Sequence, residues 1–272
     1  MNERDVVEMI VAACAFLLIV GTRYVLAPLR FRRSHYLAGS PEIRPLDAAQ
    51  RLPPDVEEFF KKEEGALRSC GFEPLGDHAI TNLTKRVAGN ARLFVNHPKR
   101  TLATLLVTYL KTKKEVWQIN KKSMVFRTDF ADGCSLHTSN VALLHIRPPR
   151  PTMHGYRFIR IIDPAALHRV HEAIIERLFE RKTRDLVLDS KFDGDHIRFA
   201  RWQAERERAH LVETGYYYHD KASDTLRLTV KGAFLGAWKR SWPWRQFRDR
   251  KRDRDAARVL KQIGMNEYGQ PL

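Results

Sequence analysis

The pattern of hydrophobic and polar positions begins with one long apolar segment. Residues 9–20 are apolar without interruption, and only Glu8 and Arg23 carry charge between residues 6 and 29. About 20 apolar residues are needed to cross the hydrocarbon core of a bilayer. Arg23 lies near one end, where its guanidinium can reach the interface beside Tyr24. The pattern therefore predicts a transmembrane helix over residues 6–29.

Two other structures share this pattern, a cleaved signal peptide and a buried core helix. A signal peptide has a basic N-terminal region and a cleavage site of small residues after the apolar run. Here Glu3, Asp5 and Glu8 precede the run, and the Ala-x-Ala sequence at residues 13–15 lies inside it. A strict run of 12 residues would suit a core helix, but the wider segment has the length of a membrane span. We therefore expect a membrane anchor.

The charges on either side of the segment predict its orientation. Arg30, Arg32 and Arg33 follow it closely, whereas only Arg4 precedes it. Loops rich in arginine and lysine stay on the cytoplasmic side of a membrane. The chain also has only three cysteines, which suits a reducing compartment. We expect a single-pass protein of the cell membrane whose C-terminal bulk is cytoplasmic.

Beyond the apolar segment, the pattern changes to that of an α+β protein. Prolines interrupt a linker at 34–54, and a helix is expected over 55–70. Alternating β-prone runs follow at 79–83, 91–96, 102–111, 115–120, 125–130 and 134–138. The next helix is expected over 164–182, with Asp163 as its N-cap and Pro164 in its first turn. Strands followed by a packing helix predict an antiparallel-sheet domain over 55–183.

The last part, 184–272, is expected to be a helical module with a hairpin. A helix over 195–213 precedes two β-prone segments, 216–218 and 226–230, joined by a turn with Asp220 and Asp224. The runs 211–217 and 226–232, Leu-Val-Glu-Thr-Gly-Tyr-Tyr and Leu-Arg-Leu-Thr-Val-Lys-Gly, resemble the wing of a winged-helix domain. The resemblance implies a winged-helix-like C-terminal module that binds nucleic acid or protein.

The net charge of +16 comes from two short segments. Residues 84–127 contain 11 basic side chains and one acidic, and residues 239–261 contain 10 basic and 3 acidic. Such local excess is typical of contact with a polyanion, either anionic lipid head groups or a phosphate backbone. A solvated face that keeps the protein soluble is the alternative.

The second basic segment also holds a cluster of tryptophans. Phe234, Trp238 and Trp242 share one face of a helix, although Pro243 would break that helix. Aromatic side chains beside cations are typical of a helix that lies on an anionic membrane. The alternative is a tryptophan stripe packed in the core. We expect membrane or anion contact through Trp238, Trp242, Trp244, Lys239, Arg240, Arg245, Arg248, Arg250, Lys251 and Arg252.

Candidate chemistry is sparse. Asp129, Cys134 and His137 combine a thiol, an imidazole and a carboxylate in one hairpin, but strand alternation would place Cys134 and His137 on opposite faces. His168 and His171, followed by Glu172, match neither arrangement of the zincin motif. We expect these histidines on a solvated helix face and no metal site. No glycine-rich phosphate loop occurs, so we expect no cofactor.

Together these patterns predict an N-terminal anchor at 1–33, the linker, the α+β domain and the C-terminal module. The expected function is that of a membrane-anchored, cytoplasmic-facing binding or scaffold protein whose basic patches contact an anionic membrane surface. One alternative is a membrane-tethered nucleic-acid-binding protein that uses the winged-helix-like module. A further alternative is an enzyme that uses the hairpin at 129–140.

Overall fold

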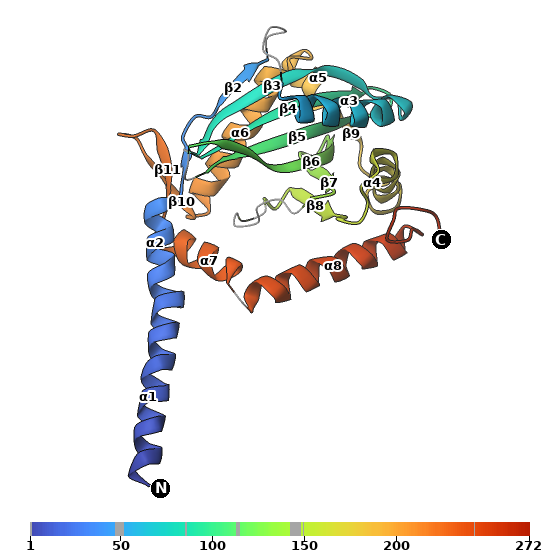
Figure 1. Ribbon diagram of the computed structural model, residues 1–272. Coiled ribbons are helices and arrows are strands. Elements are labelled where there is room, and N and C mark those ends of the chain that lie inside the picture. Colours follow the sequence, from blue (N-terminus) through green and yellow to red (C-terminus); the bar gives the residue numbers. More distant parts are fainter. Residues whose placement is uncertain are drawn as a thin grey trace. The chain divides into compact units, whose positions relative to one another are not determined.

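The fold combines antiparallel sheets with helices, which confirms the α+β prediction (Figure 1). The structure is a computed structural model that describes residues 2–46, 52–84, 86–112, 115–141, 148, 150–241 and 243–272. The chain divides into two compact units. Unit 1 comprises Met1–Gly39, Ile146–Pro148 and Arg208–Asp249, and unit 2 comprises Ser40–His145, Pro149–Glu207 and Arg250–Leu272.

Unit 2 contains a large sheet. Its strands, in spatial order, are β2 (Glu42–Pro45), β3 (Glu73–Thr84), β4 (Val87–Asn96), β5 (Thr101–Lys111), β6 (Trp117–Phe130), β7 (Ser135–Ser139) and β8 (Met153–Arg157). Neighbouring strands are antiparallel except β7 and β8, which are parallel. A short strand, β9 (Arg184–Asp185), also pairs with β6. Successive side chains along a strand point to opposite faces, and hydrophobic clusters lie on both faces of this sheet.

Helices α3 (Pro54–Ser69) and α4 (Pro164–Leu178) bury their apolar sides in a core cluster on one face of this sheet. Phe60 of α3 and Ile174 of α4 are fully buried there with Phe126 of β6. The start of α4 is as predicted, because the Asp163 side chain accepts a hydrogen bond from the Ala166 backbone N–H.

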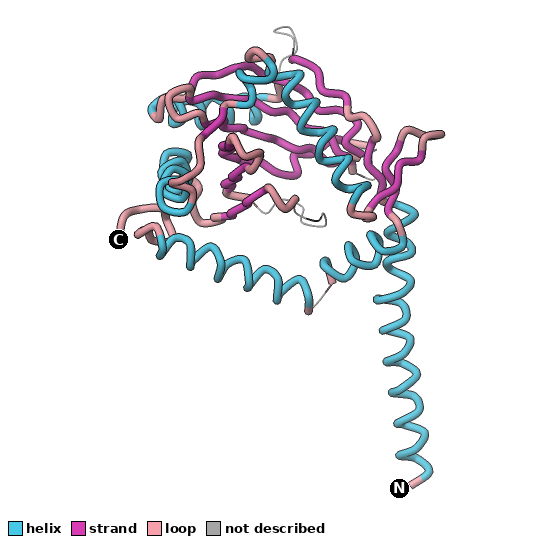
Figure 2. The backbone as a smooth tube through the Cα atoms, turned by 180° about the vertical axis from the view of Figure 1, so that it is seen from behind, coloured by secondary structure: helices cyan, strands magenta, loops and turns pink. Residues whose placement is uncertain are grey.

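The opposite face of the sheet is covered by α5 (Val187–Phe192) and by the part of α6 (His196–Glu213) that belongs to unit 2. Figure 2 shows α6 crossing this face. Leu93 and Val95 of β4 pack here with Phe199, whereas Phe94 packs in the core on the side of α3. This alternation explains why the strands are apolar on both faces, since each face has its own helical layer.

Several elements differ from the predictions. The runs at 115–120 and 125–130 belong to the single strand β6, whose pairing with β5 shifts register beside Tyr109. The structure also contains α5, β8 and β9, which the sequence pattern did not indicate. The segment expected to be a linker contributes β1 (Tyr36–Ala38) and β2.

Unit 1 begins with three consecutive helical segments and also contains a small sheet. The segments are α1 (Glu3–Val20), a π-helical turn η1 (Gly21–Leu26) and α2 (Ala27–Ser34). The predicted hairpin forms β10 (Tyr217–Asp220) and β11 (Thr225–Leu228), and β1 pairs with β11. Residues of this sheet pack with Leu211 and Ala233 in a small hydrophobic core. A winged-helix module is not shown by this arrangement.

The C-terminal aromatic segment forms two helices, α7 (Val230–Arg240) and α8 (Trp244–Gln262). Thr229 caps α7 by accepting a hydrogen bond from the Gly232 backbone N–H. Gly232 leaves no room for a Cβ atom, because its Cα faces the backbone of Tyr216 closely. Pro243 separates the two helices, as its effect on helices predicts.

Candidate functional site

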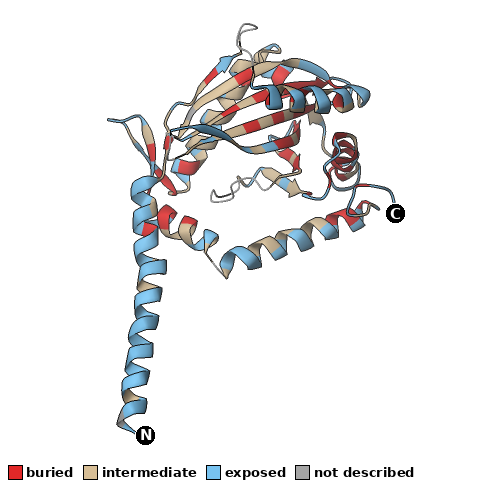
Figure 3. Cartoon of the chain, viewed as in Figure 1, coloured by how far each residue is buried: buried red, intermediate tan, exposed pale blue. Residues whose placement is uncertain are grey.

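The exposed apolar helix is the first part of the candidate site. The helical stretch Arg4–Ser34 is 31 residues long, and none of its most apolar 18-residue window is buried. Figure 3 shows α1 coloured as exposed along almost its whole length. Its length and composition are sufficient to cross a membrane, and a signal sequence has the same properties. Among the described residues it is the one helix that meets these criteria.

Helix α7 packs beside the end of this apolar stretch, against α2 and η1. Its buried positions are small residues, Gly232, Ala233 and Gly236. The Arg240 guanidinium lies 5.2 Å from the centre of the Phe31 ring of α2, and burial lowers its pKa. This packing places the aromatic and basic residues of α7 where the apolar helix ends.

Lys239 and Arg240 are therefore part of the packing of unit 1 as well as of its charge. The Lys239 Nζ donates a hydrogen bond to the Tyr216 hydroxyl at 3.1 Å and lies 5.1 Å from the centre of that ring. A cation over an aromatic face is stabilised by the ring quadrupole. Two of the predicted lipid-contact cations thus have protein partners.

The tryptophans near this position are exposed. Trp238 on α7 and Trp244 on α8 have exposed fractions of 42% and 57%, so neither packs in a core. Each stacks edge-on against a phenylalanine of its own helix, Phe234 and Phe247 respectively. Trp242 lies outside the described residues. Exposed tryptophans beside cations have the composition of a membrane-interface belt.

The basic residues of α8 divide between the two units. Arg245 and Arg248 belong to unit 1, where both lie 3.8 Å from carboxylate oxygens of Asp249. Arg250, Lys251 and Arg252 belong to unit 2, and the first two are exposed. Unit 1 thus brings together Trp238, Lys239, Arg240, Trp244, Arg245 and Arg248 from the predicted set.

The basic segment at 84–127 does not form one continuous cationic surface. Arg92 is bound by Asp77 and Glu64, with the shortest N–O distances at 2.6 and 2.7 Å. Arg127 forms a buried ion pair with Asp129 at 2.7 Å on the other side of the sheet from α3. These two arginines are neutralised inside the fold, which the count of charges along the sequence could not reveal.

Exposed apolar residues of this segment lie at the tip of the β5–β6 hairpin. Leu110, Val116 and Trp117 are exposed here by 43%, 55% and 46%. Lys111 at the end of β5 pairs across the hairpin with Trp117 and forms an ion pair with Glu115. Two further lysines, 113 and 114, lie in the sequence of this turn but outside the described residues. We call residues 110–117 the hairpin tip.

The hairpin at 129–140 forms as predicted, but its three candidate residues do not converge. Cys134 packs against the core on the α3 side of the sheet. His137 is next to Arg127 in the register, on the opposite face, and its Nε2 is 3.2 Å from the Ser135 hydroxyl. Asp129 is bound to Arg127. Burial and the nearby Arg127 lower the pKa of His137 well below its usual value.

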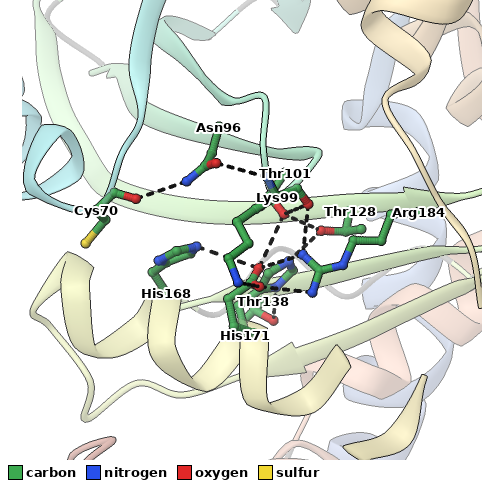
Figure 4. Close-up of polar contacts among 10 residues, drawn as sticks. Cys70, Asn96, Lys99, Thr101, Thr128, Thr138, His168, His171 and Arg184 are labelled. Carbon is green, nitrogen blue, oxygen red and sulfur yellow. Dashed lines mark hydrogen bonds and ion pairs between the residues drawn. The ribbon is translucent and has the colours of Figure 1, made fainter. Parts of the chain in front are cut away.

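A buried polar network between α4 and the sheet was not predicted (Figure 4). His171 is completely buried, and its two ring nitrogens lie 2.9 Å from the Thr128 hydroxyl and 2.8 Å from the Thr138 hydroxyl. The Thr128 hydroxyl is also 2.8 Å from that of Thr101. A neutral imidazole has one donor and one acceptor nitrogen, so these hydroxyls satisfy both. Burial lowers the pKa of His171 and keeps the ring neutral.

Glu172 extends this network to two basic residues, one before the start of β5 and one in β9. Arg184 donates to both of its carboxylate oxygens, at 3.0 and 2.9 Å, and the Lys99 ammonium lies 3.5 Å away. The prediction of a solvated face for His168, His171 and Glu172 was wrong, since all three are buried. The reason is that this side of α4 faces the threonines of β6 and β7, which offer hydrogen bonds to His171 in place of water. Glu172 is bound by Arg184, and the ring of His168 packs against Phe72 and Phe126. The network holds α4 on the sheet.

Within the part of the chain that the structure describes, no group of three or more His, Cys, Asp or Glu residues could hold a metal ion. Comparison of the chain with protein-family models, with curated proteins and with solved structures found no match.

Proposed function

We propose that this protein is anchored in the cell membrane by residues 6–29 as a single-pass protein and binds the anionic surface of the cytoplasmic leaflet. It would act there as a binding or scaffold protein. The observation that carries the proposal is the exposed apolar helix whose C-terminal end packs against α7, the helix that bears Trp238, Lys239 and Arg240. Aromatic and basic side chains at the end of an apolar helix favour the membrane interface.

The proposed orientation is supported by the charges on either side of the span. Arg30, Arg32 and Arg33 of α2 lie on the C-terminal side of the span, and Arg4 alone lies on the other. The Arg32 side chain donates a hydrogen bond from its Nε to the Leu228 carbonyl, which connects α2 to the small sheet of unit 1. The positive-inside rule then favours a cytoplasmic position for the residues that follow the span.

The anchor is tested with the full chain in washed membranes. Alkaline carbonate should leave the protein in the membrane pellet, and mass spectrometry should find the N-terminal segment intact. Leu17→Arg places a charge near the middle of the span at a cost of about 3 kcal/mol, so this variant should be extracted.

Protease added to sealed right-side-out vesicles should spare the C-terminal part until the vesicles are opened. A mature N-terminus beyond the apolar run would show that the segment is a signal peptide.

The hairpin tip supplies a second surface for contact with anionic lipid. Its exposed apolar residues, Leu110, Val116 and Trp117, lie beside Lys111 and close in sequence to lysines 113 and 114. Each basic residue near an anionic bilayer contributes on the order of 1 kcal/mol, and an inserted aromatic side chain adds hydrophobic contact. We therefore expect the tip to enter the interface of an anionic bilayer.

A polarity-sensitive fluorophore at Val116→Cys, in a variant without the natural cysteines, measures this contact. Its emission should shift to shorter wavelength when the full chain is placed in vesicles with anionic lipid, and less in zwitterionic vesicles. Replacing both Lys113 and Lys114 by glutamine should reduce the shift, as should added salt. The same fluorophore at Tyr268→Cys, an equally exposed position in unit 2, provides the control. A response to duplex DNA in detergent and none to anionic vesicles would instead support the nucleic-acid alternative.

A further inference from the structure

We infer that the apolar helix carries a binding site for one anionic phospholipid, in a groove at the junction of α1, η1 and α2. This inference rests on the proposed membrane anchor. The groove has a volume of about 460 Å³ and is lined by Leu18, Ile19, Thr22, Arg23, Ala27 and Arg30. It is an open depression on the surface of the helix and does not enclose its contents.

The local backbone shapes this groove. The turn Gly21–Leu26 is π-helical, and the Ala27 N–H bonds to the Thr22 carbonyl five residues earlier. A π-helical turn widens the helix and changes the direction of the side chains that follow it, and such turns occur often at functional sites. Ala27 has a short side chain and lies in the sequence between the two arginines that line the groove. The groove is on the exposed side of the helix, whereas Pro28 on the other side is buried.

The charge in the groove is uncompensated within the described residues. Neither Arg23 nor Arg30 forms a hydrogen bond or an ion pair with a described side chain, and both are exposed. The sequence of η1 and α2 contains no acidic residue. Two guanidinium groups beside one groove suit a phosphate, because each presents a planar fork of donors to its oxygens.

The polarity along the groove matches the direction of a lipid in the leaflet next to α2. Leu18 and Ile19 line the end toward α1, within the apolar run, and Arg30 lines the end toward the polar boundary. Seven residues of helix separate Arg23 from Arg30, a rise of roughly 10 Å. A phosphate near the two arginines would thus lie at the depth of the head groups, with an acyl chain along Leu18 and Ile19. A net negative head group is favoured, since none of the described residues that line the groove is acidic and could bind the ammonium of a zwitterionic lipid.

The test uses the full chain extracted in native bilayer patches from membranes with phosphatidylglycerol and phosphatidylcholine. Mass spectrometry of the retained lipid gives the enrichment of phosphatidylglycerol over the bulk membrane. Arg23→Gln and Arg30→Gln should each lower the enrichment roughly fivefold, the factor that corresponds to about 1 kcal/mol for one cation at an anionic surface. Ala27→Phe should lower it similarly, because it fills the groove without changing the charge.

Arg33→Gln is the matched control, since Arg33 is an exposed arginine of the same helix outside the groove. It should retain most of the enrichment. An equal loss in Arg33→Gln, or no loss in Ala27→Phe, would overturn the site and leave only a general attraction of charge. In that case every variant would still resist carbonate extraction. Failure of the anchor is distinguished because the wild-type protein itself would then be absent from the membrane.

Discussion

Replacing Glu172 by glutamine will lower the free energy of unfolding of unit 2 by about 3 kcal/mol, the size expected when one partner of a buried ion pair is removed. The Glu172 carboxylate is buried and receives two hydrogen bonds from Arg184, with Lys99 nearby. Glutamine keeps the shape of the side chain but offers one acceptor oxygen and no charge. The Arg184 guanidinium would then be left partly buried without a counter-charge.

Glu176 provides a matched control for this prediction, because it lies one turn further along α4 and is exposed. Glu176→Gln should change the free energy of unfolding by less than about 0.5 kcal/mol, as most surface substitutions do. Urea unfolding of the full chain in detergent, followed by circular dichroism, measures both variants, and hydrogen exchange locates the loss in α4. Equal stability of the two variants would contradict a structural role for the network.

A double-mutant cycle isolates the pair itself. The variant with both Glu172→Gln and Arg184→Gln should be more stable than the sum of the two single effects predicts, because neither charge is then left alone. Contacting residues typically show such coupling at about 0.5–3 kcal/mol. Additive effects would show that Arg184 is stabilised mainly by its hydrogen bond to the Lys99 carbonyl.

The burial of the polar residues of α4 could not be predicted from the sequence. The apolar positions of α4 predicted a helix with one buried side, and Leu167, Val170 and Ile174 are indeed in the core. The neighbouring polar positions gave no sign of burial, since their partners are threonines on three different strands. Alternation predicts that a strand has two faces but does not determine which helix covers each face. A buried polar residue can therefore be recognised only after the layers have been assembled.

The surface features of the chain were more predictable from sequence. The apolar helix, the break at Pro243 and the exposed aromatic residues beside it depend on local composition and helix geometry. The count of charges in residues 84–127 was a poor predictor of a cationic surface, because two of these arginines are in ion pairs. Arg92 pairs with Asp77, and Arg127 pairs with Asp129. Counting charges therefore overestimates a cationic surface wherever a strand contributes its arginines to the interior of a fold.

Acid will destabilise unit 2 at a pH where its carboxylates are still ionised, because several of its histidines are buried as neutral rings. Burial, with a smaller effect from His196, lowers the pKa of His78 to about 4, while Asp77 opposes the shift. Burial also lowers the pKa of His137, His168 and His171. Below about pH 6.5 the unfolded chain binds protons that the folded unit does not, so the free energy of unfolding falls as the pH falls.

For His78 the size of this effect follows from its pKa. With about 6.5 in the unfolded chain and about 4 in the folded unit, His78 alone should remove about 2 kcal/mol of stability between pH 7.5 and pH 5. Carboxylates with lowered pKa values, such as those of Glu42 and Asp195, lose their contribution only below this range, near and under their usual values of 4.5 and 3.8. The interval from pH 7.5 to pH 5 therefore reports mainly on histidines.

The measurement compares urea unfolding of the wild type and His78→Gln at pH 7.5 and pH 5. The variant will lose stability at both values through altered packing, but its difference between the two pH values should be about 2 kcal/mol smaller than that of the wild type. Taking the difference between the pH-dependent changes of the two proteins also cancels the contribution of Glu63. Burial raises the pKa of Glu63, so its contribution has the opposite sign. Thr152→Ala, at an exposed position of unit 2 and without loss of a titratable group, should keep the full difference. If His78→Gln keeps it too, the ring of His78 must accept a proton in the folded protein, and its burial would not impose neutrality.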